Sequence, residues 1–299
     1  MNWTESKFTG ENPMDLLVST VRSHKDFCTT LGIFDEYKKA VRKKGHIGAK
    51  DESGSREHLL GRYLNSAART QLAICPCHGD HFEMTQELIA QLLTQKLYVI
   101  DIASGHGAGT ISIINSICHL KLVEKRFSTD PLDIEIHALD FSETSLGYYE
   151  ALIEQLRPLH LSAGIAIRVV KHKVDLRNDG EIKSTVEQIK KNIGANPQYL
   201  LTCSAISGVT RKEFEKHFAN SYNYIATQFR DDNSLFFWVE PRTEKNWIQK
   251  IWQGIAVKLG IKMPSEAYKS QNIRFHWADP HTKSVLPTGA EYFLLELAS

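Results

Sequence analysis

The chain has 299 residues, of which 42% are hydrophobic and 24% are charged. Its 36 lysines and arginines nearly balance its 35 aspartates and glutamates, which leaves a formal net charge of +1. This balance excludes a globally basic nucleic-acid-binding chain and an acidic disordered tail. The length suits one large domain or two small ones.

The five cysteines are too few and too scattered to indicate a disulfide framework. The N-terminal segment is polar and contains no apolar core, so we expect no signal peptide. No run of about 18 apolar residues occurs, so we also expect no membrane span. These features are typical of a soluble protein of a reducing compartment, and we expect the chain to be cytoplasmic.

The N-terminal third is expected to be helical. Apolar residues at helical spacing predict four helices, over residues 14–31, 33–41, 57–74 and 84–93. The segment 51–55 has no apolar residue and is predicted to be a surface loop. The basic stretch 38–50 has almost no interleaved aromatic residues, which favours a solvated helix face over a phosphate-binding surface.

From residue 96 the pattern changes to alternating strands and helices. Apolar runs predict seven strands, over residues 97–103, 134–140, 164–176, 198–206, 234–241, 273–280 and 291–298. A helix follows each of the first five strands, and Ser142 and Thr210 are placed to cap two of these helices.

This alternation predicts an α/β fold with a doubly wound, mostly parallel seven-stranded sheet and a C-terminal antiparallel hairpin, preceded by an N-terminal helical region. We expect a helical lid or substrate region over residues 1–95 and the sheet domain over residues 96–299.

A glycine-rich turn follows the first of these strands and reads Asp101-Ile-Ala-Ser-Gly-His-Gly-Ala-Gly-Thr110. In an open α/β sheet, ligands bind outside the carboxyl ends of the strands, beside the first strand. Glycines let the backbone approach a ligand, and the next helix presents free N–H groups to it. The turn lacks the lysine of a P-loop, and Thr110 stands where a dinucleotide fingerprint has its third glycine, so both of those sites are disfavoured.

The stretch VIDIASGHGAGT resembles motif I of the class I S-adenosylmethionine (SAM)-dependent methyltransferases, whose pattern is D-x-G-x-G-x-G. Asp101, Gly105 and Gly107 match this pattern, and Ala103 stands in place of its first glycine. The resemblance covers about residues 96–299. It implies a Rossmann-like fold, SAM as the cofactor, and transfer of the sulfonium methyl group to an acceptor.

Polar residues end the following strands in the order that this family has them. Asp140 ends the second strand, where the family's acid accepts hydrogen bonds from both ribose hydroxyls. An ordinary acid beside the Ser142 cap is the alternative for Asp140, and a plain polar turn is the alternative for Asp175. The resemblance implies the cofactor-binding residues Asp101, Ala103, Gly105, Gly107, Asp140, Phe141, Asp175, Leu176 and Cys203.

The acceptor leaves a weaker trace in the sequence, because methyl transfer depends mainly on proximity and alignment. A general base is needed only when the nucleophile carries a proton at neutral pH. We therefore assign no catalytic residue. Candidate substrate contacts are Arg62, Tyr63, His106, Ser204 and Glu240. Tyr63 equally fits the apolar stripe of its helix, and His106 equally could point to solvent.

The chain has no N-P-P-Y or D-P-P-Y motif after the fourth strand, where the family's amino-methylating nucleic-acid enzymes carry one. Together with the neutral charge, this favours a small-molecule or peptide acceptor over RNA. A catalytically inactive SAM-binding regulatory or scaffold subunit remains the alternative function.

Cys75, Cys77, His78 and His81 lie close together in the sequence and are all good zinc ligands. The adjacent Cys77 and His78 would strain a single tetrahedral site, and no second ligand pair follows at the usual distance. A buried helix end followed by a polar turn is therefore favoured, and we assign no metal ligands.

Overall fold

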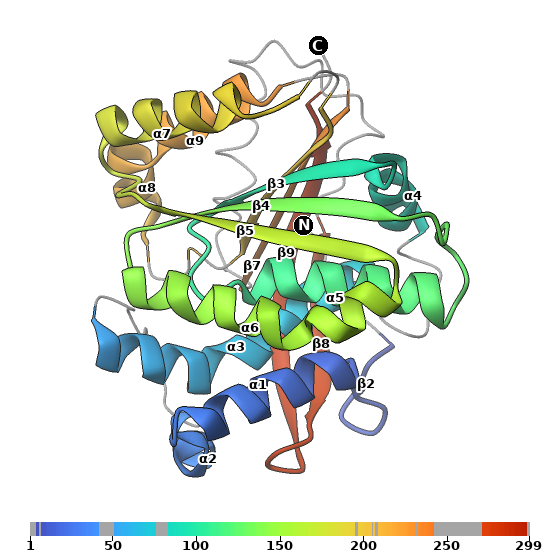
Figure 1. Cartoon of the computed structure of the whole chain (residues 1–299). Helices are drawn as coiled ribbons and strands as arrows, with labels where there is room; N and C mark the ends of the chain where they lie inside the picture. Colours follow the sequence, from blue (N-terminus) through green and yellow to red (C-terminus); the bar gives the residue numbers. More distant parts are fainter. Residues whose placement is uncertain are drawn as a thin grey trace.

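A computed structural model describes residues 4–5, 7–41, 51–75, 83–194, 197–204, 206, 209–230, 233–241 and 271–297. Within these residues the chain forms a nine-stranded sheet with helices on both faces (Figure 1). No helix in the described ranges is long and apolar enough to cross a membrane.

The strands are β1 (Thr4–Glu5), β2 (Met14–Asp15), β3 (Lys96–Ile102), β4 (Leu132–Asp140), β5 (Ile165–Lys173), β6 (Tyr199–Ser204), β7 (Ser234–Pro241), β8 (Gln271–Asp279) and β9 (Ser284–Glu296). The helices are α1 (Val18–Thr30), the 3-10 turn η1 (Phe34–Glu36), α2 (Tyr37–Ala40), α3 (Glu52–Ile74), α4 (Glu83–Leu92), α5 (Ala108–Leu122), α6 (Glu143–Ser162), α7 (Asp179–Lys191), α8 (Arg211–His217) and α9 (Ala219–Gln228).

The sheet has the order β1-β8-β9-β7-β6-β3-β4-β5, and β2 also pairs with β8. Strands β3 to β7 are parallel, and β9 lies antiparallel between β7 and β8. This arrangement confirms the expected doubly wound sheet with its C-terminal hairpin. The two short strands β1 and β2 were not expected, because a two-residue bridge leaves no periodic pattern in the sequence.

Burial along the strands explains the sequence patterns. Strands β3 and β6 lie in the middle of the sheet and are buried almost throughout, which is why their sequences are continuous apolar runs. Strand β5 is an edge strand, and after the buried Ile165 its positions are exposed or half-buried. Charged residues along such an edge hinder pairing with another chain.

Two helical layers cover the sheet (Figure 1). Helices α1, α3, α5 and α6 share one core with one face of the sheet, and α7, α8 and α9 share a second core with the other face. Residues of the N-terminal helices, such as Leu60 and Leu64 of α3, belong to the same apolar cluster as Ile114 of α5 and Val99 of β3. The N-terminal helices therefore pack directly on the sheet.

The surface loop predicted over residues 51–55 is wrong, because helix α3 already begins at Glu52. Asp51 is its N-cap, and the backbone N–H of Gly54 donates to Asp51 Oδ1 at 2.7 Å. The absence of apolar residues reflects a first helical turn that is mostly exposed, rather than a loop.

Other helix boundaries also differ from those expected from the sequence. The first helix begins at Val18, after β2, and the helix expected from Thr210 to about Phe229 is divided at Phe218 into α8 and α9. Both expected caps are confirmed: Ser142 Oγ accepts from the N–H of Ser145, and Thr210 forms a capping box. The helix expected after β7 and most of the basic stretch lie outside the described residues.

Candidate functional site

The turn between β3 and α5 follows a left-handed path. Ala103, Gly105 and Gly107 have φ angles of 54°, 52° and 71°. Glycine adopts this conformation freely, whereas an L side chain there costs about 1–2 kcal/mol. Ala103 thus adopts the conformation that a glycine in its place would favour, and the turn keeps its shape at a small energetic cost.

Close packing explains why two positions in and after the turn are occupied by glycine. A Cβ atom at Gly107 would lie 2.3 Å from ring carbons of Tyr149. A Cβ atom at Gly109, in the first turn of α5, would lie 2.4 Å from Ser204 Oγ at the end of β6. The turn is therefore fitted against α6 on one side and against the end of β6 on the other.

Asp101 is buried beneath the turn. Its Oδ2 accepts hydrogen bonds from the hydroxyls of Thr110, at 2.7 Å, and Tyr149, at 2.9 Å. Burial raises the pKa of this carboxyl to about 6. The Asp101 side chain thus fixes the starts of α5 and α6 against β3.

Asp140 lies at the end of β4, next to the turn. Its Oδ2 accepts from the N–H of Gly105 at 2.9 Å, and its Oδ1 accepts from the N–H of Ser142 at 2.8 Å. Burial raises its pKa above the ordinary range. Each carboxylate oxygen has about two acceptor positions, so both oxygens keep capacity for a further donor such as a vicinal diol.

Two further features lie at the same carboxyl end of the sheet. Phe141 directly follows Asp140, and 47% of its surface is exposed. Helix α5 has Gly107 as its N-cap, so no side chain caps it within the described residues. Its first N–H groups are available to a polar or negative group. A fixed carboxylate, an exposed aromatic ring and a helix N-terminus without a side-chain cap thus lie at this end of the sheet.

Three other expected cofactor residues make their contacts elsewhere. The Asp175 carboxylate is paired with the guanidinium of Arg177, whose hydrogen bonds lower the pKa of Asp175. The Leu176 side chain is buried in the second core. The Cys203 thiol lies 3.2 Å from the hydroxyl of Tyr222 in that core. The turn residue Ala103 packs against this same core, and cofactor binding by these three residues stays a prediction.

Two of the expected substrate residues lie on the sheet side of the site. Ser204 is beside Gly109, as described above. Glu240, at the end of β7, is buried, and its Oε1 accepts from the N–H of Ile206 at 2.6 Å and from the Trp238 indole N–H at 2.7 Å. Burial raises the pKa of Glu240 to about 8.

The other three expected substrate residues are on or beside α3. Arg62 is half-buried and donates to the carbonyl of Gly61. Tyr63 is buried and stacks on His24 with ring centroids 5.3 Å apart, so it belongs to the apolar stripe. His106 is buried and its ring stacks on His58, so it does not point to solvent. Burial lowers its pKa well below the ordinary value.

The sequence reasoning missed two residues of α3. Arg69 is buried, its Nε–H donates to the carbonyl of Gly289, and its charge lowers the pKa of Glu240 against the effect of burial. Ser55 lies with its hydroxyl 3.4 Å from that of Ser142, so the start of α3 reaches the residue that follows Phe141. An arginine or serine in an amphipathic helix carries no sequence signal for either contact.

No protein-family model matches the chain, and no curated protein matches it. Solved structures that resemble it include SAM-dependent methyltransferases. One such enzyme from Agrobacterium tumefaciens is 11% identical with a TM-score of 0.41, and the match covers 76% of this chain and 62% of that one. This chain therefore spans less than two thirds of that protein's length.

Two further structures show the same general likeness. An rRNA methylase from Streptococcus thermophilus is 10% identical with a TM-score of 0.34, and the match covers 72% of this chain and 96% of that one. A human methyltransferase 10 domain containing protein is 14% identical with a TM-score of 0.38, and the match covers 79% of this chain and 82% of that one. Matches at this level carry no argument about chemistry.

Proposed function

We propose that the chain is a SAM-dependent methyltransferase that binds its cofactor beside the turn between β3 and α5. The observation that carries this proposal is the position of Asp140. Its two oxygens are fixed by the backbone N–H groups of Gly105 and Ser142 at the point where the strand order reverses. A carboxylate held in this way is a bidentate acceptor for the two hydroxyls of a ribose.

The neighbouring groups fit the rest of the cofactor. Phe141 offers an exposed ring face to a purine, because aromatic rings favour offset stacking. The open N-terminus of α5 suits the carboxylate of the methionine portion. When bound, SAM supplies a methyl group on a sulfonium that leaves as a neutral thioether. The protein's part is to align the acceptor with that methyl group and to exclude water.

We place the acceptor on the side of the site formed by Ser204, Glu240 and Arg69. The pKa of Glu240, about 8, lies in the range where a side chain can give or accept a proton near neutral pH. We propose a small molecule or a peptide as the acceptor, because the chain's formal net charge is only +1. A polyanionic acceptor such as RNA would call for several cationic contacts.

The proposal is tested by calorimetric titration with SAM and with S-adenosylhomocysteine, using NAD as the control ligand. We expect both sulfur ligands to bind and NAD not to bind. Asp140→Ala removes two charged hydrogen bonds to the ribose, each worth about 1.5–3 kcal/mol, so binding should weaken at least roughly 100-fold. Asp133→Ala is the matched control, because Asp133 is an exposed acid on the same strand.

Thermal unfolding of both variants separates loss of binding from loss of fold. Binding that is unchanged in Asp140→Ala, or wild-type protein that binds neither sulfur ligand, would refute the proposed site. A protein that binds SAM but methylates none of the acceptors tested would instead fit the alternative function, a catalytically inactive regulatory or scaffold subunit. Methylation of an RNA fraction that falls steeply with salt would replace the small-molecule acceptor by RNA.

A further inference from the structure

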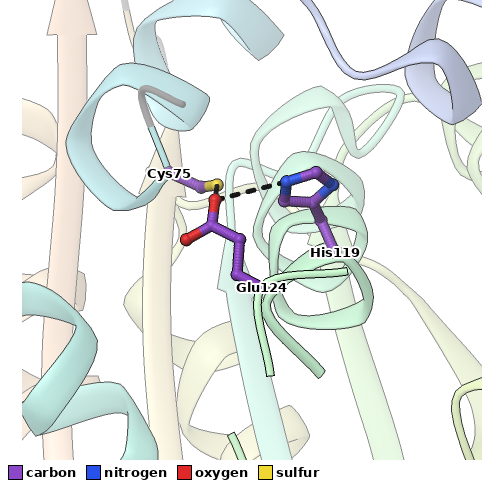
Figure 2. Close-up of side chains that lie close together, drawn as sticks. All are labelled: Cys75, His119 and Glu124. Atoms are coloured by element: carbon purple, nitrogen blue, oxygen red, sulfur yellow. Dashed lines mark hydrogen bonds and ion pairs between the residues drawn. The ribbon is translucent and has the colours of Figure 1, made fainter. Parts of the chain in front are cut away.

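Three metal-ligating side chains meet at the end of α5 that lies away from the glycine-rich turn (Figure 2). Cys75 is the C-cap of α3, His119 lies in the last turn of α5, and Glu124 follows that helix. Their Sγ, Nε2 and carboxylate oxygen atoms all lie within 4.8 Å of one another. Cys75 is buried, and the side chains of His119 and Glu124 are 24% and 27% exposed.

Two of the three distances between these atoms match a tetrahedral metal site, and the third, from Cys75 Sγ to His119 Nε2, is within 4.8 Å. Cys75 Sγ lies 3.6 Å from Glu124 Oε1, and His119 Nε2 lies 3.3 Å from the same oxygen. Zinc bonds of about 2.3 Å to sulfur and about 2.1 Å to nitrogen or oxygen, at tetrahedral angles, place such ligand atoms about 3.4–3.6 Å apart. A single ion between the three atoms therefore requires only small shifts of the side chains.

The two helix ends beside the three side chains favour a cation, and Arg126 orients one of the ligands. Both α3 and α5 end here, and the C-terminus of a helix carries partial negative charge. The second oxygen of Glu124, Oε2, is held by Arg126 at 3.2 Å, which leaves Oε1 directed at Cys75 and His119. Arg126 is in turn held by the amide oxygen of Gln86 at 3.1 Å. Such outer contacts orient the ligands of metal sites.

We propose that Cys75, His119 and Glu124 bind one zinc ion. A thiolate, an imidazole and a carboxylate together form a donor set that zinc accepts, whereas magnesium and calcium prefer oxygen donors alone. In the sequence, the possible metal ligands near Cys75 are Cys77, His78 and His81, and these three residues lie outside the described residues. The fold supplies partners that stand more than 40 residues further along the chain.

The position of the zinc site separates it from the proposed cofactor site. Twelve residues of α5 separate Gly107 from His119, which corresponds to roughly 18 Å along the helix axis. The ion joins the end of α3 to the end of α5, two helices of the layer that covers one face of the sheet. Zinc should therefore change the stability of the protein and leave the affinity for SAM unchanged.

The test is the metal content of the purified full-length chain, followed by competition with a chromogenic zinc chelator. We expect one equivalent of zinc, and a cobalt-substituted protein with thiolate-to-cobalt charge-transfer absorption. His119→Ala and Glu124→Gln should lose the equivalent of zinc. Arg126→Gln should weaken zinc binding about 10- to 100-fold. Chelation should lower the unfolding temperature of wild type but not of His119→Ala.

Two controls match the substitutions. Cys118→Ala removes a neighbouring buried thiol that belongs to the apolar core, and His217→Ala removes an exposed histidine of α8. Both should keep the zinc. His119→Ala and Glu124→Gln test the site without truncating the buried Cys75. Zinc retained in both of these variants, or wild-type protein that binds neither zinc nor cobalt, would overturn the assignment.

Discussion

Gly105 and Gly107 share a left-handed backbone but differ in what surrounds them. No atom outside the local chain lies within 4 Å of a Cβ at Gly105, whereas a Cβ at Gly107 would overlap Tyr149. Gly105→Ala should therefore cost only the conformational strain, about 1–2 kcal/mol. Gly107→Ala should cost roughly 2–5 kcal/mol, because overpacking of a buried ring adds to the strain. Urea unfolding of the two variants measures the difference, and equal losses would contradict this account of the turn.

The buried carboxyl of Asp101 should make stability depend on pH. Its pKa is raised from 3.8 to about 6, so between these values the folded chain holds a proton that the unfolded chain has released. The contribution of Asp101 to the free energy of unfolding therefore decreases as the pH rises through this window, by roughly 3 kcal/mol at most. Above about pH 6 it stays at its lower level.

Asp101→Asn removes this titration. Relative to wild type, the variant's free energy of unfolding should increase between about pH 4 and pH 7, as measured by urea unfolding at each pH. Asp133→Asn, an exposed acid on β4, should show no comparable trend. A difference between Asp101→Asn and wild type that is constant with pH would show that the carboxyl is not perturbed as described.

In the candidate site, the residues that the sequence placed side by side are those whose position follows from chain order. The glycine-rich turn and Asp140 each end a strand, and parallel strands bring their carboxyl ends to one edge of the sheet. Cys203 also ends a strand, but its thiol faces the second core. In a strand that is apolar on both faces, the sequence does not show which face a given side chain takes.

At the scale of elements, the start of α3 depends on one side chain. Asp51 accepts a hydrogen bond from the N–H of Gly54 and is the N-cap of the helix. Asp51→Ala should destabilise the protein by about 1 kcal/mol, whereas Asp51→Asn keeps the acceptor and should cost only a few tenths. Denaturant unfolding distinguishes the two, and an unchanged Asp51→Ala would argue that α3 begins later in solution.

The same cap explains why this element was misjudged from the sequence. Residues 51–55 contain no apolar side chain, so composition alone indicated a loop. The capping acid Asp51 precedes the first periodic apolar residue, Leu59, by about two helical turns, so apolar periodicity does not mark this helix start. The β-strands were easier to predict, because a buried central strand such as β3 differs sharply in composition from its surroundings.

At the scale of the whole molecule, the helical layers and the sheet depend on one another. Helix α5 is buried almost all round, because it lies between the sheet and the N-terminal helices. A fragment of residues 96–299 would expose one side of this helix to water. We expect that fragment alone to be unfolded or aggregated by circular dichroism and gel filtration, and to be rescued by co-expression of residues 1–95. A stable, monomeric fragment would instead support two separate domains.

The sequence did not show which distant parts of the chain lie close together in space. Cys75, His119 and Glu124 come from α3, α5 and the turn that follows α5, and nothing in their spacing indicates that they meet. Arg69 and Glu240 likewise come from α3 and β7. Such contacts depend on how the N-terminal helices pack over the sheet, and periodicity alone does not determine that packing.

The most direct test of the central claim is a crystal structure of the chain with bound S-adenosylhomocysteine. We expect the ribose hydroxyls to donate to the two oxygens of Asp140 and the purine to lie against Phe141. We also expect the carboxylate of the homocysteine portion to lie at the N-terminus of α5. A nucleoside bound away from Asp140, or no bound ligand at a saturating concentration, would contradict the account.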